Sequence, residues 1–199
     1  MASGRGGGDA PIATPSRALG PAFDMPESPT RPRSDAGGEA ALDPAVGIGH
    51  IHLKVSDLER AIAFYRDALG FALMQRMGRE AAFLSAGGYH HHIGLNTWES
   101  RGCRPPARGN TGLYHFALLY PSRRDLGRAL RRLLTHGVAL DGAADHGVSE
   151  ALYLHDPDGN GIELYRDRPR AEWPHDAGGG LAMVTEPLDL QALLAEADG

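Results

Sequence analysis

Hydrophobic and polar residues alternate from Gly49 and then take up a helical spacing, so the first folded segment is predicted to be a strand followed by a helix. Ser56, with Glu59 three residues later, is a capping-box signal for the start of this helix, and Gly70 is a signal for its end. One helix face is apolar and carries Leu58, Ile62, Tyr65 and Leu69.

Two short strands are expected after this helix. The pattern places one over 81–85 and the other over 90–98, with the turn signal Gly87-Gly88 between them. The first half of the folded region therefore has the order strand, helix, strands.

A second segment repeats this order. His115 takes the place of His50 at the start of its first strand, and Ser122 with Asp125 marks the start of its helix. The apolar face of this helix carries Leu126, Leu130, Leu133 and Leu134, and Gly137 ends it. The expected continuation is a strand over 150–155, a turn over 156–159 and a strand over 161–165.

A unit that is repeated in the sequence and has one apolar sheet face is expected to pack against its second copy, so that this face is covered. We therefore predict an α+β fold of two paired βαβββ modules, about residues 46–100 and 112–168, which form a curved mixed sheet around a metal-binding cleft. Residues 1–45, rich in Gly, Pro, Ala, Ser and Arg, are expected to be disordered. Residues 169–199 are expected to form a tail with a short helix over 187–197, docked on the sheet or on a second subunit.

Composition narrows the function classes. The 199 residues are 42% hydrophobic and 23% charged with a formal net charge of -5, which is typical of a soluble globular protein and gives no reason to expect nucleic acid. The arginines around the second helix are interpreted as its solvated face; they are Arg123, Arg124, Arg128, Arg131 and Arg132. There is no apolar run long enough for a membrane span and no secretory signal, and the single Cys103 fits a reducing compartment. We expect a cytoplasmic protein without a membrane partner, and the sequence is compatible with a homo-oligomer.

Three residues at strand positions form a candidate metal site: His50, His115 and Glu163. The two histidines hold equivalent positions in the repeat, and Glu163 lies on a last strand. Taken singly, each histidine on a strand is more often an ordinary core residue than a ligand. Two imidazoles and one carboxylate nevertheless form a ligand set that suits Fe(II), or Mn(II) as the alternative, with open positions. Gly94 occupies the first-half position that corresponds to Glu163, so no fourth ligand is expected.

The segments HIHLKVSDLERAIAFYRDALGF, GLYHFALLY and LYLHDPDGNGIELY resemble the vicinal-oxygen-chelate superfamily, over about residues 46–168. This superfamily includes glyoxalase I, the fosfomycin-resistance thiol transferases, bleomycin-binding proteins and the type I extradiol dioxygenases. Within it, the sequence around His90, His91 and His92 is most similar to the extradiol, catechol 2,3-dioxygenase-like enzymes.

That resemblance implies further site residues. His91 matches the histidine that serves as acid and base, Tyr153 matches a tyrosine beside the bound catecholate, and His146 lies near the place of a second active-site histidine. Strict strand alternation would put His91 on the opposite face from Gly94, so this role requires a bulge or an irregular strand entry. His90 and His92 remain alternatives for the same role.

The resemblance implies an enzyme, a metal-dependent extradiol dioxygenase of aromatic catabolism that cleaves a catechol-type diol with O2. Three alternatives stay open. One is a thiol transferase of the fosfomycin-resistance kind, and another is a glyoxalase-like isomerase, against which the glycine at position 94 counts. The third is a metal-free protein that binds a small molecule.

Overall fold

The structure, a computed structural model, describes residues 42–43, 45–107 and 109–198. The segment 1–45, expected to be disordered, lies outside the described residues except for residues 42, 43 and 45. The chain divides after Val46, and every helix and strand below belongs to the unit that begins at Gly47.

The first module contains two short consecutive helical segments and a four-stranded sheet. Its elements are β1 (Ile51–Lys54), α1 (Leu58–Ala63), the π-helical η1 (Phe64–Ala68), β2 (Ala72–Met77), β3 (Ala81–Ser85) and β4 (Ile93–Asn96). The strand order is β1-β4-β3-β2, in which β1 runs parallel to β4 and the other neighbours are antiparallel. This is the βαβββ order predicted from the sequence.

The second module repeats that arrangement. Its elements are β5 (Phe116–Leu119), α2 (Arg123–Thr135), β6 (Gly142–Asp145), β7 (Ser149–His155) and β8 (Gly161–Asp167). The strand order β5-β8-β7-β6 matches that of the first module, and β5 is again parallel to β8. His52 lies opposite Gly94 in the first module, as Ala117 lies opposite Glu163 in the second. The predicted α+β fold with paired modules is confirmed, with the hydrogen bonds organised in two mixed sheets.

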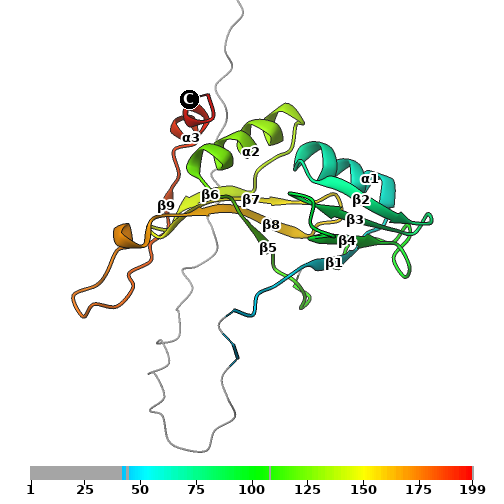
Figure 1. Cartoon of the computed structure of the whole chain (residues 1–199), viewed down its shortest axis with the longest axis horizontal. Helices are drawn as coiled ribbons and strands as arrows, with labels where there is room; N and C mark the ends of the chain where they lie inside the picture. Colours follow the sequence, from blue (N-terminus) through cyan, green and yellow to red (C-terminus); the bar gives the residue numbers. More distant parts are fainter. Residues whose placement is uncertain (1–41, 44, 108, 199) are drawn as a thin grey trace, which may run out of the picture. The chain divides into compact units, whose positions relative to one another are not determined.

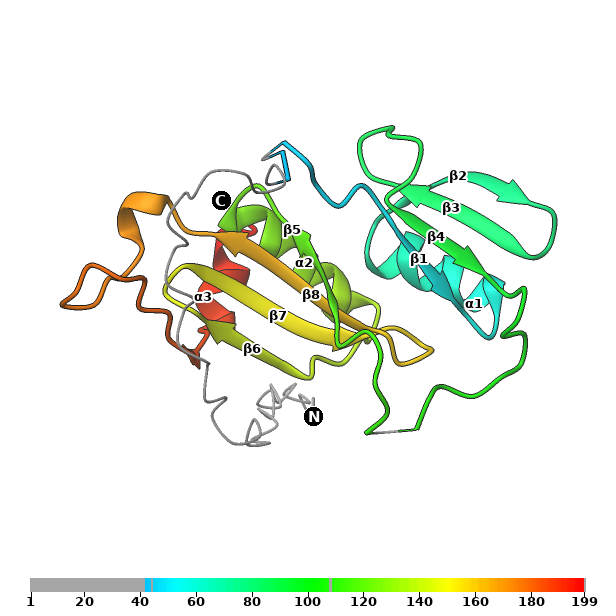
Figure 2. The same cartoon turned by 90° about the horizontal axis from the view of Figure 1, so that it is seen from below.

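Each sheet carries its helix on one face only. α1 packs on β3 and β4, and α2 packs on β8 (Figure 1). Figure 2 shows the opposite, helix-free faces of both sheets, with the helices behind them. Apolar residues of both modules form one buried cluster, which includes Leu84, Leu95, Leu130, Leu152 and Leu164. Since side chains alternate along a strand, residues between these core positions point to the helix-free face.

The joint between the modules is an acidic loop. Asp156 and Asp158, at the turn between β7 and β8, are buried. The Tyr65 hydroxyl donates to Asp156 Oδ2 at 2.9 Å, and the Ser56 hydroxyl donates to Asp158 Oδ1 at 2.5 Å. Arg60 also donates to Asp158 Oδ1, at 2.7 Å. The second module thus holds the start of the helix of the first.

The contacts of this loop show that the predicted N-cap of the first helix is wrong. Asp57, and not Ser56, is the N-cap of α1, since its side chain accepts from the backbone of Arg60. Ser56 is committed to Asp158 instead. The start of the second helix is as predicted, because the Ser122 hydroxyl accepts from the backbone N–H of Asp125.

The tail folds back on the second module. It contains η2 (Arg170–Glu172), β9 (Glu186–Pro187) and α3 (Leu190–Glu196). β9 pairs with β6 and becomes the fifth strand of the second sheet, while α3 packs against α2 with Leu193 fully buried. The helix expected to dock on the sheet or on a second subunit packs on α2 instead, and only β9 joins the sheet.

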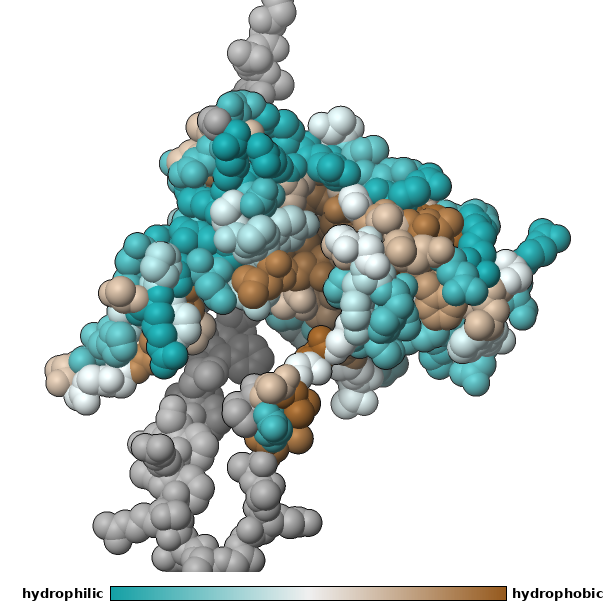
Figure 3. Space-filling view, in the orientation of Figure 1, coloured by the Kyte–Doolittle hydropathy of each residue, from teal (hydrophilic) through white to brown (hydrophobic). Residues whose placement is uncertain are grey.

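Docking of the tail also changes the interpretation of the arginines on α2. Arg124 and Arg128 are exposed as predicted, and Figure 3 shows a polar surface over α2 and α3. Arg123, however, is three-quarters buried and donates to Glu150 and Glu196, and Arg131 pairs with Asp198. These two arginines fasten α3 and the end of the tail rather than facing solvent alone.

No helix in the part of the chain that the structure describes is long and apolar enough to cross a membrane.

Candidate functional site

His115 and Glu163 come together on the helix-free face of the second sheet. Ile162 and Leu164, on either side of Glu163 in β8, are buried in the core, so Glu163 points away from α2. His115 immediately precedes β5, the parallel neighbour of β8. Its Nε2 lies 3.1 Å from Glu163 Oε2, with the side chains 32% and 15% exposed. Two of the three predicted metal ligands are therefore within contact distance.

Tyr153 and His146 extend this pair into a row. Tyr153 lies opposite Glu163 in the β7–β8 register, and its hydroxyl donates to Glu163 Oε1 at 3.0 Å. The same hydroxyl is 2.8 Å from His146 Nε2. Burial, and then the neighbouring Glu163 carboxylate, raise the pKa of Tyr153 far above its usual value, so the phenol keeps its proton. The row His146, Tyr153, Glu163 and His115 joins four of the six predicted site residues.

His50 and His91 lie on the first module. His50 precedes β1 and is exposed, and its ring centroid is 4.5 Å from that of His91. His91 lies in irregular chain just before β4, because the strand begins at Ile93 and not at residue 90 as expected. The irregular strand entry that the role of His91 required is thus present. Burial, and then the neighbouring histidines, lower the pKa of His91, which keeps its ring neutral near pH 7.

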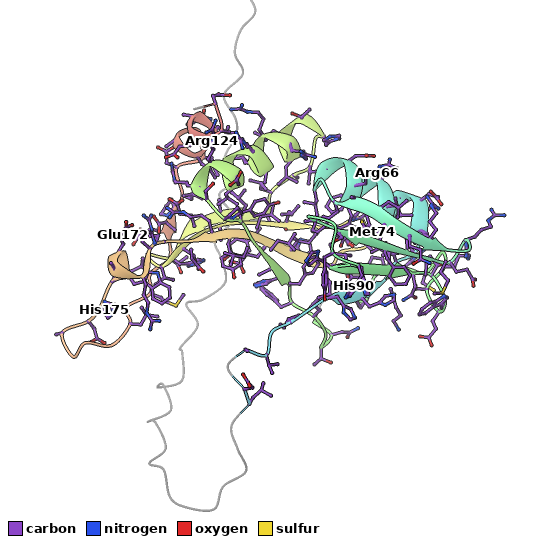
Figure 4. The ribbon with its side chains drawn as sticks, viewed as in Figure 1. Arg66, Met74, His90, Arg124, Glu172 and His175 are labelled. Atoms are coloured by element: carbon purple, nitrogen blue, oxygen red, sulfur yellow. The ribbon has the colours of Figure 1, made fainter. Side chains whose placement is uncertain are left out.

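The three consecutive histidines have different neighbours. The Nδ1 atom of His92 is 3.0 Å from the Ser85 hydroxyl and accepts from the backbone N–H of Ala86, so this ring is held against the end of β3. His90 stacks on Tyr89 with centroids 3.9 Å apart, on the side of the first module away from α1 (Figure 4). Of the three rings, His91 is the one beside His50.

The predicted set of three metal ligands is not gathered at one point. Within residues 42–43, 45–107 and 109–198 there is no group of three or more His, Cys, Asp or Glu side chains that could hold a metal ion. His115 and Glu163 are together, whereas His50 lies against His91. The structure therefore brings together two of the three residues and leaves the third, His50, just before the equivalent strand of the other module.

Gly94 is covered by an imidazole. A Cβ added at Gly94 would come within 2.9 Å of the His52 ring. The first module thus has an aromatic ring over the position at which the second has its carboxylate, and a fourth ligand has no room there unless His52 moves. Sequence reasoning did not single out His52, although its alternation with the buried Leu53 would have placed it on this face.

Aromatic rings continue from His91 across the helix-free face of the first sheet. Centroid distances are 5.1 Å from His91 to Phe83, 6.0 Å from Phe83 to His52 and 5.5 Å from His52 to Trp98. We call Phe83, His52 and Trp98 the aromatic strip. Trp98 is 55% exposed, which leaves its face open to a ligand.

The paired βαβββ modules, together with the histidine and glutamate side chains on their helix-free faces, point to one protein superfamily. The family model of the Glyoxalase/Bleomycin resistance protein/Dioxygenase superfamily matches residues 47–164, and the chain belongs to this superfamily. It is 47% identical over 150 residues to Catechol-2,3-dioxygenase of Bacillus subtilis (strain 168), covering 75% of this chain and 52% of the relative. It is 29% identical over 120 residues to Biphenyl-2,3-diol 1,2-dioxygenase 3 of Rhodococcus globerulus, covering 60% of this chain and 63% of the relative.

Solved structures support the fold. A glyoxalase/dioxygenase from Nostoc punctiforme matches with a TM-score of 0.55 at 20% identity, covering 67% of this chain and 100% of that one. A glyoxylase/bleomycin resistance protein/dioxygenase domain from Frankia sp. EAN1pec matches with a TM-score of 0.52 at 25% identity, covering 62% and 98%. The chain spans about half to under two thirds of the length of the curated relatives it matches.

Proposed function

We propose that the protein is a metal-dependent extradiol dioxygenase that opens the ring of a catechol-type aromatic diol with O2. The observation that carries this proposal is the row His146, Tyr153, Glu163 and His115, in which proton-bearing side chains adjoin a carboxylate–imidazole pair. The relatives named as catechol and biphenyl-diol dioxygenases support the same reaction class. The cytoplasmic localisation of the protein stays a prediction.

His50, His115 and Glu163 would hold the metal, Fe(II) with Mn(II) as the alternative. The donor chemistry fits a divalent metal, because two imidazoles and one carboxylate leave positions open for other ligands. The contact between His115 and Glu163 supplies two of these donors, and His50, exposed at the equivalent position of the repeat, is the candidate for the third. A bound metal would supply the redox-active Lewis-acid centre that a reaction of a diol with O2 requires.

The acid–base work would fall to His91. A neutral imidazole can accept a proton from a diol hydroxyl and return it later in the reaction. The lowered pKa of His91 and its contact with His50 suit this role. His90 and His92 are less suited, because the first stacks on Tyr89 and the second is held by Ser85.

Tyr153 and His146 would stabilise negative charge. Tyr153 keeps its phenol proton, so it can donate a hydrogen bond to an oxygen that becomes negative during the reaction. His146 would position Tyr153 through the 2.8 Å contact between its Nε2 atom and the Tyr153 hydroxyl. Both side chains would orient the diol and need not change their covalent bonds.

A second function has a specific observation in its favour. The lack of a three-residue metal group among the described residues, together with the open aromatic strip, would suit metal-free binding of an aromatic compound. In that case the protein would bind aromatic diols and release them unchanged.

One experiment separates the two. The protein is purified anaerobically, loaded with ferrous iron, mixed with catechol and exposed to air. The dioxygenase proposal predicts a yellow ring-opened semialdehyde and uptake of one O2 per diol, both lost in Glu163→Ala and retained in the control His175→Ala, whose exposed imidazole lies on the tail (Figure 4). If protein shown to contain iron binds catechol without taking up O2, the dioxygenase proposal is wrong and the binding function remains.

A further inference from the structure

The tail reaches the proposed active site through a backbone group. The Nδ1 atom of His146 lies 3.0 Å from the carbonyl oxygen of Val184, and the N–H of Val184 donates to the carbonyl of His146 at 3.1 Å. Residues 146 and 184 are therefore joined twice, once through the backbone and once through the imidazole. Val184 lies beyond residue 164, at which the match to the family model ends.

Two neighbouring elements hold Val184 in place. Directly after it, β9 pairs with β6, with Glu186 opposite Asp145 and Pro187 opposite Ala144. Gly147, next to His146, has a positive φ of 74° and no side chain, and a Cβ there would come within 2.9 Å of Pro174 and 3.3 Å of Val184. The close approach of the two segments therefore depends on the glycine at 147.

A carbonyl oxygen can only accept a hydrogen bond, so the Nδ1 atom that faces it must carry the hydrogen. In a neutral imidazole the other nitrogen, Nε2, then has a free lone pair. Here Nε2 faces the Tyr153 hydroxyl at 2.8 Å. The Thr185 hydroxyl, 3.4 Å from Nδ1, is the only other side-chain partner of that atom in the described part of the chain, and it can also accept.

We propose that the Val184 carbonyl is a positioning group that fixes His146 as the Nδ1–H tautomer, and so makes Nε2 the proton-accepting atom that faces Tyr153. The catalytic meaning of this inference rests on the proposed dioxygenase function, whereas the tautomer itself does not.

The fixed tautomer determines how protons are shared along the row. Tyr153 has one phenolic hydrogen and two acceptors, Glu163 Oε1 at 3.0 Å and the lone pair of His146 Nε2. When His146 is neutral, the phenol can turn toward Nε2. When Nε2 has gained a proton, it donates to the phenol oxygen and the phenol donates to Glu163. The tail thus makes His146 take up or release a proton only at the atom that faces the site.

The test is a measurement of histidine tautomers in the full-length, metal-free protein. Long-range ¹H–¹⁵N correlation spectra of protein labelled with ¹⁵N-histidine distinguish Nδ1–H from Nε2–H rings, and the signals that vanish in His146→Gln identify His146 among the ten histidines. The spectra are recorded at a pH high enough for His146 to be neutral. We expect the Nδ1–H pattern in the wild-type protein, and an Nε2–H pattern there overturns the proposal without any variant.

A matched pair of variants tests whether Val184 is the cause. Val184→Ala keeps both backbone groups and should keep the tautomer. Val184→Pro lacks the N–H that bonds His146, so the carbonyl should shift, the pure Nδ1–H pattern should be lost, and kcat on catechol should fall about 10- to 100-fold with a smaller change in KM. If Val184→Pro folds and leaves both the tautomer and kcat unchanged, the Val184 carbonyl is not the positioning group. A protein that cleaves no diol in any form refutes the proposed function and leaves the tautomer result standing.

Discussion

At the scale of single residues, the proposed acid–base role distinguishes His91 from the two adjacent histidines. His91 contacts His50 and Phe83, while His92 is bound to the end of β3. We expect His91→Ala to retain the metal and to lower kcat on catechol by roughly 10²- to 10⁴-fold, the range typical of a lost acid–base group. Steady-state kinetics together with metal analysis of each preparation measure this.

His175→Ala is the control, since its imidazole is exposed on the tail, whereas His90 is unsuitable because its Nδ1 atom lies 2.8 Å from Nδ1 of His91. His175→Ala should keep nearly full turnover. Equal losses in the two variants would mean that the effect is not specific to His91, and full activity of His91→Ala would show that the acid–base assignment is wrong.

The aromatic strip makes a prediction about substrate choice. Trp98 is half exposed at the end of the strip away from His91, where an aryl substituent of a diol could stack on it. Trp98→Ala should raise the KM for biphenyl-2,3-diol about 3- to 10-fold, as expected for one lost aromatic contact, and leave the KM for catechol nearly unchanged. Trp98→Phe should restore most of the difference, and parallel changes for both diols would exclude the strip as a substituent site.

Side-chain identity and repeat position were enough to predict that His115 and Glu163 meet. The Val184 carbonyl could not be predicted, because a backbone group has no signature in the sequence. The place of Ser56 was predicted wrongly for a related reason: Ser56 and Asp57 are adjacent and both are good N-caps, and Asp158, 102 residues away, decides between them.

At the scale of elements, the two modules contain strands that lack a hydrophobic pattern. β2 is mostly exposed and β6 has the sequence Gly-Ala-Ala-Asp, so neither has the alternation that marks a half-buried strand. Pairing with β3 and with β7 and β9 forms them instead. The helices were easier to predict, since α2 carries a continuous apolar face.

The packing of α3 on α2 depends on one glycine. A Cβ at Gly127 would come within 2.4 Å of the Leu193 carbonyl oxygen, which is backbone and cannot simply rotate away. Gly127→Ala should therefore loosen α3 and lower the free energy of unfolding by about 1–3 kcal/mol, as overpacking does in other cores. Urea denaturation measures the change.

Gly142→Ala is the control for this substitution, because nothing lies within 4 Å of a Cβ at Gly142. If Gly127→Ala proves as stable as this control, the close contact between α2 and α3 is absent in solution. If stability falls while the tautomer of His146 is unchanged, β9 alone is sufficient to hold Val184.

At the scale of the whole folded unit, one core and one acidic loop join the two modules. The buried contact between Tyr65 and Asp156, and the bonds from Ser56 and Arg60 to Asp158, fix α1 and η1 to the turn before β8. The repeat predicted the two modules and the faces on which the candidate ligand residues lie. It could not predict how near His50 comes to Glu163, since that distance depends on contacts between modules that no periodic pattern encodes.

The most direct test of the central claim is a crystal structure of the protein loaded anaerobically with ferrous iron. The account predicts iron bound by the imidazoles of His50 and His115 and the carboxylate of Glu163, with His50 drawn from its position against His91. Iron bound at other residues, or a protein that binds no iron while His115 and Glu163 stay in contact, would contradict it.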